Sequence, residues 1–183
     1  GNKNIDTAEK ELFFSLSKAY DLYNHLLSLI VAVTKEAQRR LEVTQGRAKR
    51  EGTPEPSQKF AYNRFAIQLQ ENKALNEFIG NQKTNWADTP VPGQLFETIE
   101  QSEIYKDYMA SSEDTYDADR ELWRKLYKTF IQENPDLDNA LEDQSLYWND
   151  DKEIVDTFVL KTIKRFKEQN GTKQELLPEW DSD

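Results

Sequence analysis

Residues 12–37, LFFSLSKAYDLYNHLLSLIVAVTKEA, decide the fold of this chain. Apolar side chains recur there at alternating spacings of four and three residues, at Leu12, Leu16, Ala19, Tyr23, Leu26, Ile30, Val33 and Ala37. This alternation places them on one side of an α-helix, which completes a turn in about 3.6 residues. The stretch therefore predicts one long amphipathic helix.

A second apolar stripe lies beside the first and consists of Phe13, Tyr20, Leu27 and Val31. Between Leu26 and Val33 the helix is consequently apolar on nearly every side, so it needs cover from several directions. Asp6 and Glu9 have the spacing of a helix N-terminus, and we expect the helix to run from about residue 7 to about residue 43. A central core helix is the favoured interpretation, and a partner-binding helix is the minor alternative.

The remainder of the chain repeats this helical spacing between segments that contain Gly and Pro. Because these residues interrupt helices, we expect linker-like breaks near 45–58 and 84–93. Further helices are predicted at about 59–82, 94–109 with a candidate interruption at Ser102, 116–133, 136–146 and 149–169. No segment shows the two-residue alternation of a strand. We therefore predict an all-α fold, with residues 1–183 forming a single helical domain: a bundle of about six helices with one long central helix.

Charge and composition narrow the classes of function. The net charge of −10 over 183 residues argues against a protein that binds nucleic acid by overall electrostatics, although it permits a local basic patch. The absence of cysteine excludes a disulfide framework and suits a cytoplasmic protein. The longest apolar run, Leu29 to Val33, is far shorter than the about 20 residues of a membrane span, so no membrane association is expected.

The sequence predicts no enzyme, no metal site and no cofactor. His25 is the only histidine, beside Leu26 and Leu27, which favours a helix-surface or core-edge residue over a catalytic base. A dense acidic cluster consists of Asp143, Asp150, Asp151, Glu153 and Asp156. It lacks the spacing of a calcium loop, and acids this frequent give a glycosidase-like pair by chance. A solvated negative cap at a helix N-terminus is the favoured interpretation.

Positive charge outweighs negative charge most clearly between residues 38 and 50, where the basic side chains are Arg39, Arg40, Arg47, Lys49 and Arg50. Cations are favoured at a helix C-terminus by the helix dipole alone, and contact with RNA is the second interpretation. Tryptophans can stack on bases. Trp123 and Trp148 lie in apolar surroundings and are predicted to be packed, whereas Trp86 and Trp180 lie in polar loops and are predicted to be exposed.

Several segments resemble the NusB family of bacterial transcription antitermination proteins, and in particular a long-chain branch of that family. The similar segments are EKELFFSLSKAYDLYNHLL at 9–27, RELWRKLYK at 120–128 and LEDQSLYWNDDKEIVDTFVLKTIKRF at 141–166. The family's Arg-rich first helix and the C-terminal stretch around its NEY and NG pattern are absent, so the resemblance assigns no functional residue here. It implies that the chain is an internal segment between that first helix and the C-terminal NusB domain.

The resemblance implies an all-helical, non-catalytic protein that binds boxA-type RNA together with a ribosomal protein acting as NusE. Two interpretations are open: a helical region of such a factor that contacts RNA or proteins of the transcription complex, and a helical protein-interaction scaffold without a nucleic-acid role. Because the family's first helix and C-terminal domain are missing, we also expect some of the apolar surface between Leu26 and Val33 to be exposed, which would lead either to self-association or to a stability below that of the full chain.

Overall fold

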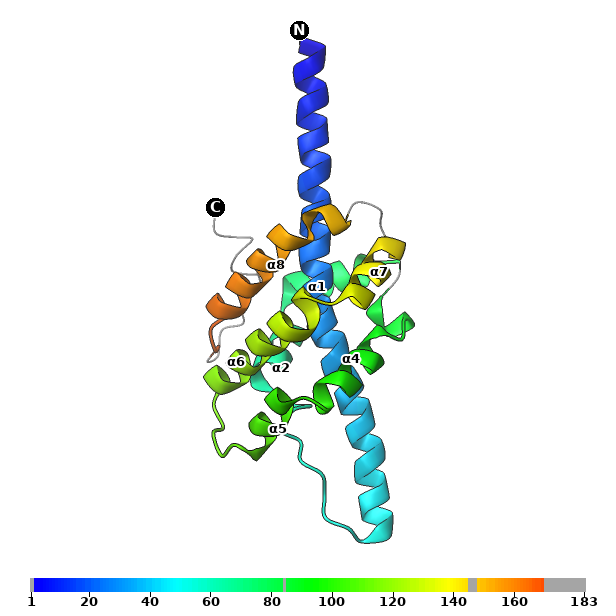
Figure 1. Cartoon of the computed structure of the whole chain (residues 1–183), viewed down its shortest axis with the longest axis vertical. Helices are drawn as coiled ribbons and strands as arrows, with labels where there is room; N and C mark the ends of the chain where they lie inside the picture. The colour runs from blue at the N-terminus through cyan, green and yellow to red at the C-terminus, as the bar shows by residue number, and fades with distance from the viewer. Residues whose placement is uncertain (1, 84, 145–147, 170–183) are drawn as a thin grey trace.

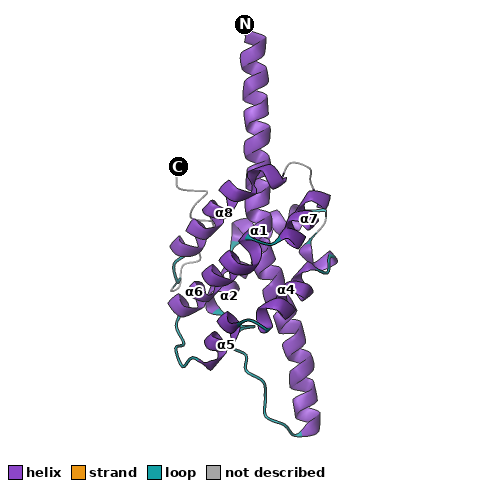
Figure 2. Ribbon diagram, in the orientation of Figure 1, coloured by secondary structure: helices purple, strands orange, loops and turns teal. Residues whose placement is uncertain are grey.

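The computed structural model describes residues 2–83, 85–144 and 148–169, and over these ranges the chain is helical with no strand (Figure 2). The elements are α1 (Asn2–Glu51), α2 (Arg64–Gln70), α3 (Lys73–Asn81), the 3₁₀ turn η1 (Trp86–Asp88), α4 (Val91–Glu100), α5 (Glu103–Ala110), α6 (Tyr116–Leu126), the π-helical segment η2 (Tyr127–Gln132), α7 (Pro135–Gln144) and α8 (Trp148–Arg165). The predicted all-α fold with one long helix is confirmed.

Helix α1 runs through the whole bundle as its axis, and α2, α3, α4 and α8 pack around its middle (Figure 1). Every residue from Leu22 to Val31 is buried, as is Val33. The apolar side chains on every side of this segment are thus covered by other helices of the same chain. The expectation that apolar surface between Leu26 and Val33 would be exposed is therefore wrong.

The large exposed apolar side chains of α1 lie instead toward its ends, at Val43 near the C-terminus and at three residues near the N-terminus. Ile5, Leu12 and Leu16 have 59 %, 59 % and 52 % of their surface exposed. They continue the stripe that is buried further along the helix, because their spacings of seven and four residues keep them on one face. This part of α1 extends beyond the bundle at one end, and the C-terminal part extends beyond it at the other (Figure 1).

Aromatic side chains fill the core between the outer helices and α1. Trp123 of α6 is fully buried and lies 5.8 Å from Phe60, measured between ring centroids. Phe65 of α2 meets Phe166 edge to face at 5.8 Å, and the Tyr23 hydroxyl is hydrogen-bonded to Thr162 Oγ1 at 2.5 Å. These contacts join α1, α2 and α8 into one core, and the predicted burial of Trp123 is confirmed.

The first predicted break begins too early. Helix α1 continues to Glu51, and an isolated Gly46 within it costs only about 1 kcal/mol relative to Ala. The helix ends at Gly52, whose φ of 67° lies in the left-handed region that favours glycine. The amide of Thr53 then donates to the carbonyl of Ala48 at 3.0 Å, which closes the helix end.

Asparagine and serine caps divide the later helices more finely than predicted. The predicted helix at 59–82 is two helices, because the side chains of Asn63 and Asn72 each accept a hydrogen bond from an amide of a new first turn, Ala66 N and Leu75 N, both at 3.0 Å. Ser102 caps α5 in the same way and confirms the interruption at that residue. The break at 84–93 also ends early, because α4 begins at Val91 with Pro92 in its first turn. Over the described residues the α-helices therefore number eight, where about six were predicted.

Candidate functional site

The basic residues near the end of α1 divide into two groups. Arg39 and Arg40 both bind Glu36: Arg39 Nη2 lies 2.7 Å and Arg40 Nε 2.8 Å from Glu36 Oε1. Arg40 also pairs with Glu97 of α4 at 3.2 Å. Hydrogen bonds from the two guanidinium groups, that of Arg39 most strongly, lower the pKa of the Glu36 carboxyl to about 2. The charges of these two arginines are thus partly compensated within the protein.

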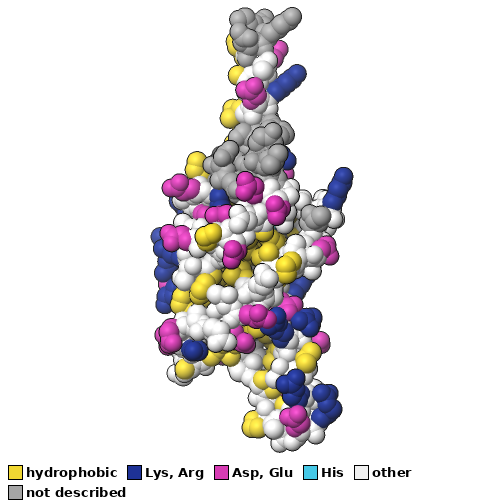
Figure 3. Space-filling view, turned by 45° about the vertical axis from the view of Figure 1, so that its right-hand side comes forward, with side chains coloured by type: hydrophobic (Ala, Val, Ile, Leu, Met, Phe, Trp, Pro, Cys, Tyr) yellow, Lys and Arg dark blue, Asp and Glu magenta, His cyan; other side chains and the backbone are white. Residues whose placement is uncertain are grey.

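Arg47, Lys49 and Arg50 form the second group, on the last turns of α1. All three are exposed, and none forms an ion pair with a residue in the described part of the chain. Lys and Arg side chains gather at this end of the molecule in the space-filling view, over the part of α1 that extends beyond the bundle (Figure 3). We call Arg47, Lys49 and Arg50 the basic tip.

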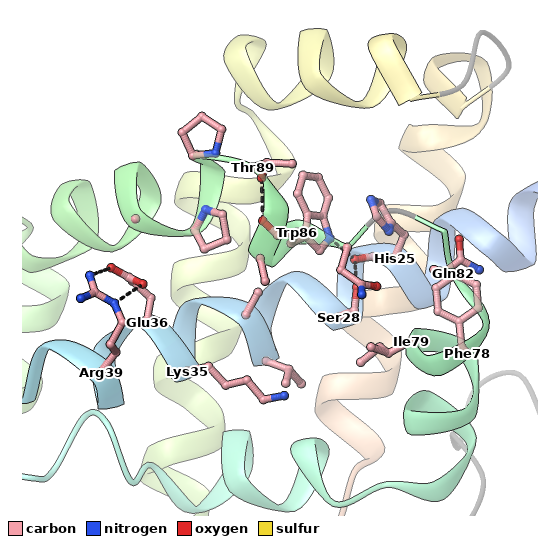
Figure 4. A pocket seen from close by; sticks show the side chains of 17 residues that line it. His25, Ser28, Lys35, Glu36, Arg39, Phe78, Ile79, Gln82, Trp86 and Thr89 are labelled. Atoms are coloured by element: carbon pink, nitrogen blue, oxygen red, sulfur yellow. Dashed lines mark hydrogen bonds and ion pairs between the residues drawn. The ribbon is translucent and has the colours of Figure 1, made fainter. Parts of the chain in front are cut away.

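A groove with a volume of about 580 Å³ lies between α1, α3, η1 and the start of α4 (Figure 4). Ligand sites in proteins commonly have volumes of about 300–1,000 Å³ and mainly apolar linings. The lining residues are His25, Ser28, Val31, Ala32, Lys35, Glu36, Arg39, Phe78, Ile79, Gln82, Asn85, Trp86, Ala87, Thr89, Pro90, Pro92 and Gly93. No pattern in the sequence predicted this groove.

His25 and Trp86 stack at one end of the groove, with ring centroids 4.2 Å apart and planes inclined by 25°. The carbonyl oxygen of His25 accepts hydrogen bonds from Trp86 Nε1 at 2.7 Å and from Ser28 Oγ at 2.6 Å. Only 2 % of the Trp86 surface is exposed, so its predicted exposure is wrong. The turn η1 directs the indole inward, and Thr89 Oγ1 donates to the Trp86 carbonyl at 2.7 Å to hold that turn.

His25 is buried, with 3 % of its surface exposed. Burial lowers the pKa of its imidazole from 6.5 to about 4, and a hydrogen bond to Gln144 partly opposes this shift. The ring is therefore neutral at pH 7 and serves as an aromatic surface. Its core-edge placement was one of the two predicted positions.

Charged side chains lie toward the other end of the groove, where Lys35 and Glu36 come from one turn of α1 and Arg39 from the next. Glu36 is the only acid in the lining, and its carboxylate is already bound by Arg39 and Arg40. Lys35 is exposed and forms no ion pair with a described residue. The groove thus combines an apolar half with a half whose available charge is positive.

The predicted acidic cluster is not a uniformly solvated cap. Asp143 and Glu153 are exposed, but Asp156 is buried beside Lys152, with Lys152 Nζ 2.8 Å from Asp156 Oδ2. Burial raises the pKa of Asp156, while the hydrogen bonds from Lys152 and Tyr127 lower it. The side chains of Asp150 and Asp151 lie outside the described residues, as do Trp180 and the side chain of Trp148.

Lys152 also completes the π-helical segment η2. Its Nζ donates to the carbonyls of Ile131 at 3.2 Å and Gln132 at 2.8 Å, which are the last two residues of that segment. Asp156 accepts a further hydrogen bond from the Tyr127 hydroxyl at 2.5 Å. This buried ion pair therefore has a structural role. Within the described ranges no three His, Cys, Asp or Glu residues are placed to hold a metal ion.

Among the described residues, no helix is both long enough and apolar enough to cross a membrane. No protein-family model matches this chain, and no curated protein or solved structure matches it either.

Proposed function

We propose that this chain is the helical region of a NusB-like transcription antitermination factor, and that it binds boxA-type RNA without catalysis. The proposal combines the sequence resemblance with the placement of the similar segments. Residues 9–27 lie on α1 and 120–128 on α6 and η2; of the segment 141–166, residues 141–144 lie on α7 and 148–166 on and just after α8. Helix α8 packs against both α1 and α6, so the resemblance covers one connected part of the core.

The observation that carries the RNA assignment is the basic tip. Within the described part of the chain Arg47, Lys49 and Arg50 form no ion pair, whereas Arg39 and Arg40 share Glu36. In a chain with a net charge of −10, phosphates are repelled from most of the surface. At physiological salt this repulsion decays over about 8 Å, so three cations on an extended helix end form a suitable local contact.

Fluorescence anisotropy with a labelled single-stranded boxA-type RNA tests the proposal. Changing Arg47, Lys49 and Arg50 together to Gln is expected to weaken binding at least about tenfold, because three phosphate contacts are lost. Each phosphate contact to a single strand contributes about 0.7 to the slope of log affinity against log salt, so the slope should fall by about 2.

A matched control changes three exposed lysines elsewhere to Gln and so makes the same change in net charge. These are Lys10, Lys106 and Lys125. RNA affinity should change much less in this control than in the basic-tip variant. Equal affinities of the wild type and the basic-tip variant at every salt concentration would contradict the proposal.

A protein-interaction scaffold without a nucleic-acid role is the second candidate, and two observations favour it: the groove beside α1 and the exposed stripe of Ile5, Leu12 and Leu16. Large exposed apolar patches mark interfaces. By the resemblance, the NusE-type ribosomal protein is the first partner to test. Binding of that protein at full affinity in the absence of RNA, together with no measurable RNA binding by the chain, would favour the scaffold.

A further inference from the structure

The groove beside α1 is elongated. Its lining residues on α1 run from His25 to Arg39 and recur every three or four positions, so they form one face of the helix over four turns. At a rise of about 1.5 Å per residue, this face is about 21 Å long. An extended peptide of about six residues spans the same length at about 3.3 Å per residue, whereas most small ligands are shorter.

We propose that this groove binds an extended segment of a protein partner that carries a large apolar side chain at one end and carboxylates at the other. The apolar side chain would lie against Phe78 and Ile79, next to the almost fully buried Trp86, and the carboxylates would lie beside Lys35 and Arg39. This inference rests on the geometry of the groove alone and is independent of RNA binding at the basic tip.

The apolar end is suited to a side chain and not to a phosphate. Phe78 and Ile79 come from α3, and Trp86, Pro90 and Pro92 come from η1 and the start of α4, so the two walls belong to separate elements (Figure 4). The Trp86 indole is fixed by its hydrogen bond to His25 and by its stacking on the His25 ring. A wall that is already ordered loses little conformational entropy when a ligand binds.

The charged end selects an acidic segment. Glu36 is compensated by two arginines, which leaves the Lys35 ammonium and the exposed side of Arg39 to face a ligand. Arg39 retains 62 % exposure of its side chain despite its ion pair. Although the net charge of the protein is −10, the positive charge available in the groove favours acidic segments and disfavours basic ones.

The test begins with selection from a random dodecapeptide library displayed on phage, with the whole chain as the target. We expect the enriched peptides to share a Leu, Phe or Trp separated by a few residues from Asp or Glu. The affinity of one synthetic enriched peptide is then measured by calorimetry for the wild type and four variants. In NMR spectra, the Trp86 indole signal, assigned with Trp86→Phe, should shift on binding.

Two variants alter the groove and two are controls. Lys35→Glu should weaken peptide binding about fivefold or more through charge reversal, and Phe78→Ser should weaken it about tenfold or more through loss of an apolar wall. Lys125→Glu makes the same charge reversal and Ile154→Ser a comparable apolar-to-polar change at exposed positions outside the groove, and both should leave affinity within about twofold. Circular dichroism verifies that each variant is folded.

Three results would overturn the inference: no enrichment of acidic and apolar peptides, equal affinity in wild type and both groove variants, or displacement of the peptide by boxA-type RNA, which would make the groove a nucleic-acid site. The variant with Gln at positions 47, 49 and 50 should bind the peptide normally. Loss of RNA binding in that variant with peptide binding retained would separate the two sites.

Discussion

The buried imidazole of His25 makes the stability of this protein depend on pH in a defined window. The folded chain holds the pKa of His25 at about 4, while an unfolded chain would have a value near 6.5. Below pH 6.5 the unfolded state therefore takes up a proton that the folded state does not accept until about pH 4. Stability is complete above this window and falls as the pH falls through it, by about 3 kcal/mol.

His25→Gln removes the titrating group and should remove this part of the pH dependence. Urea unfolding at constant ionic strength between pH 4 and pH 7.5 measures the free energy of unfolding for both proteins. We expect the wild type to lose about 3 kcal/mol more than the variant over this range. Burial raises the pKa of Asp156, so its contribution to stability changes with pH in the opposite sense. This contribution is present in both proteins and cancels when they are compared.

The pKa can also be measured directly, because His25 is the only histidine in the chain. Its ring-proton NMR signal can belong to no other residue, so a titration requires no further assignment. A midpoint near 6.5, or equal pH slopes for the wild type and His25→Gln, would refute the reasoning from burial.

Three further changes test other parts of the structure. Lys152→Met should lower the free energy of unfolding by about 3–5 kcal/mol in urea denaturation, because it leaves the Asp156 carboxylate buried without a cation; a loss below about 1 kcal/mol would mean that water reaches this site. Gly52→Ala should cost about 1–2 kcal/mol in the same assay, because the residue has a φ of 67°; an unchanged midpoint would contradict this conformation. Self-association remains a prediction, and light scattering should show a mass that rises with concentration in the wild type. A variant with Gln at three exposed positions, Ile5, Leu12 and Leu16, should keep the monomer mass at every concentration. Its stability should change little.

The predicted parts of the fold are those that depend on local spacing. The stripe from Leu12 to Ala37 predicted α1 because a continuous three-and-four repeat has one helical solution. The prediction failed where a single residue decides between continuation and a stop. Gly46 lies within α1 and Gly52 ends it; the left-handed φ of Gly52 and the closing hydrogen bond from Thr53 to Ala48 distinguish them. Asn72 likewise divides a segment whose apolar spacing alone indicates one helix.

The candidate sites were predictable to different degrees. The basic tip could be found from charge alone, but its separation from Arg39 and Arg40 depends on Glu36 and on Glu97, which is distant in sequence. The groove could not be found, because its walls come from segments far apart in the sequence; His25 and Trp86, for example, are 61 residues apart and meet only through tertiary packing. The polar loop around Trp86 indicated exposure, but η1 turns the indole inward and buries it. The relation to NusB stays a prediction.

The length of α1 has a mechanical consequence. Leu16 and Arg47 lie on the two free ends of one helix, about 47 Å apart at 1.5 Å per residue. Each added residue turns a helix by about 100°, so an insertion between these ends would rotate one against the other. Every residue of α1 from Leu22 to Val31 is buried, and such a rotation would break the core around them. The bundle therefore fixes the distance between the two ends of α1 and their relative rotation about the helix axis, for any molecule that binds at either end.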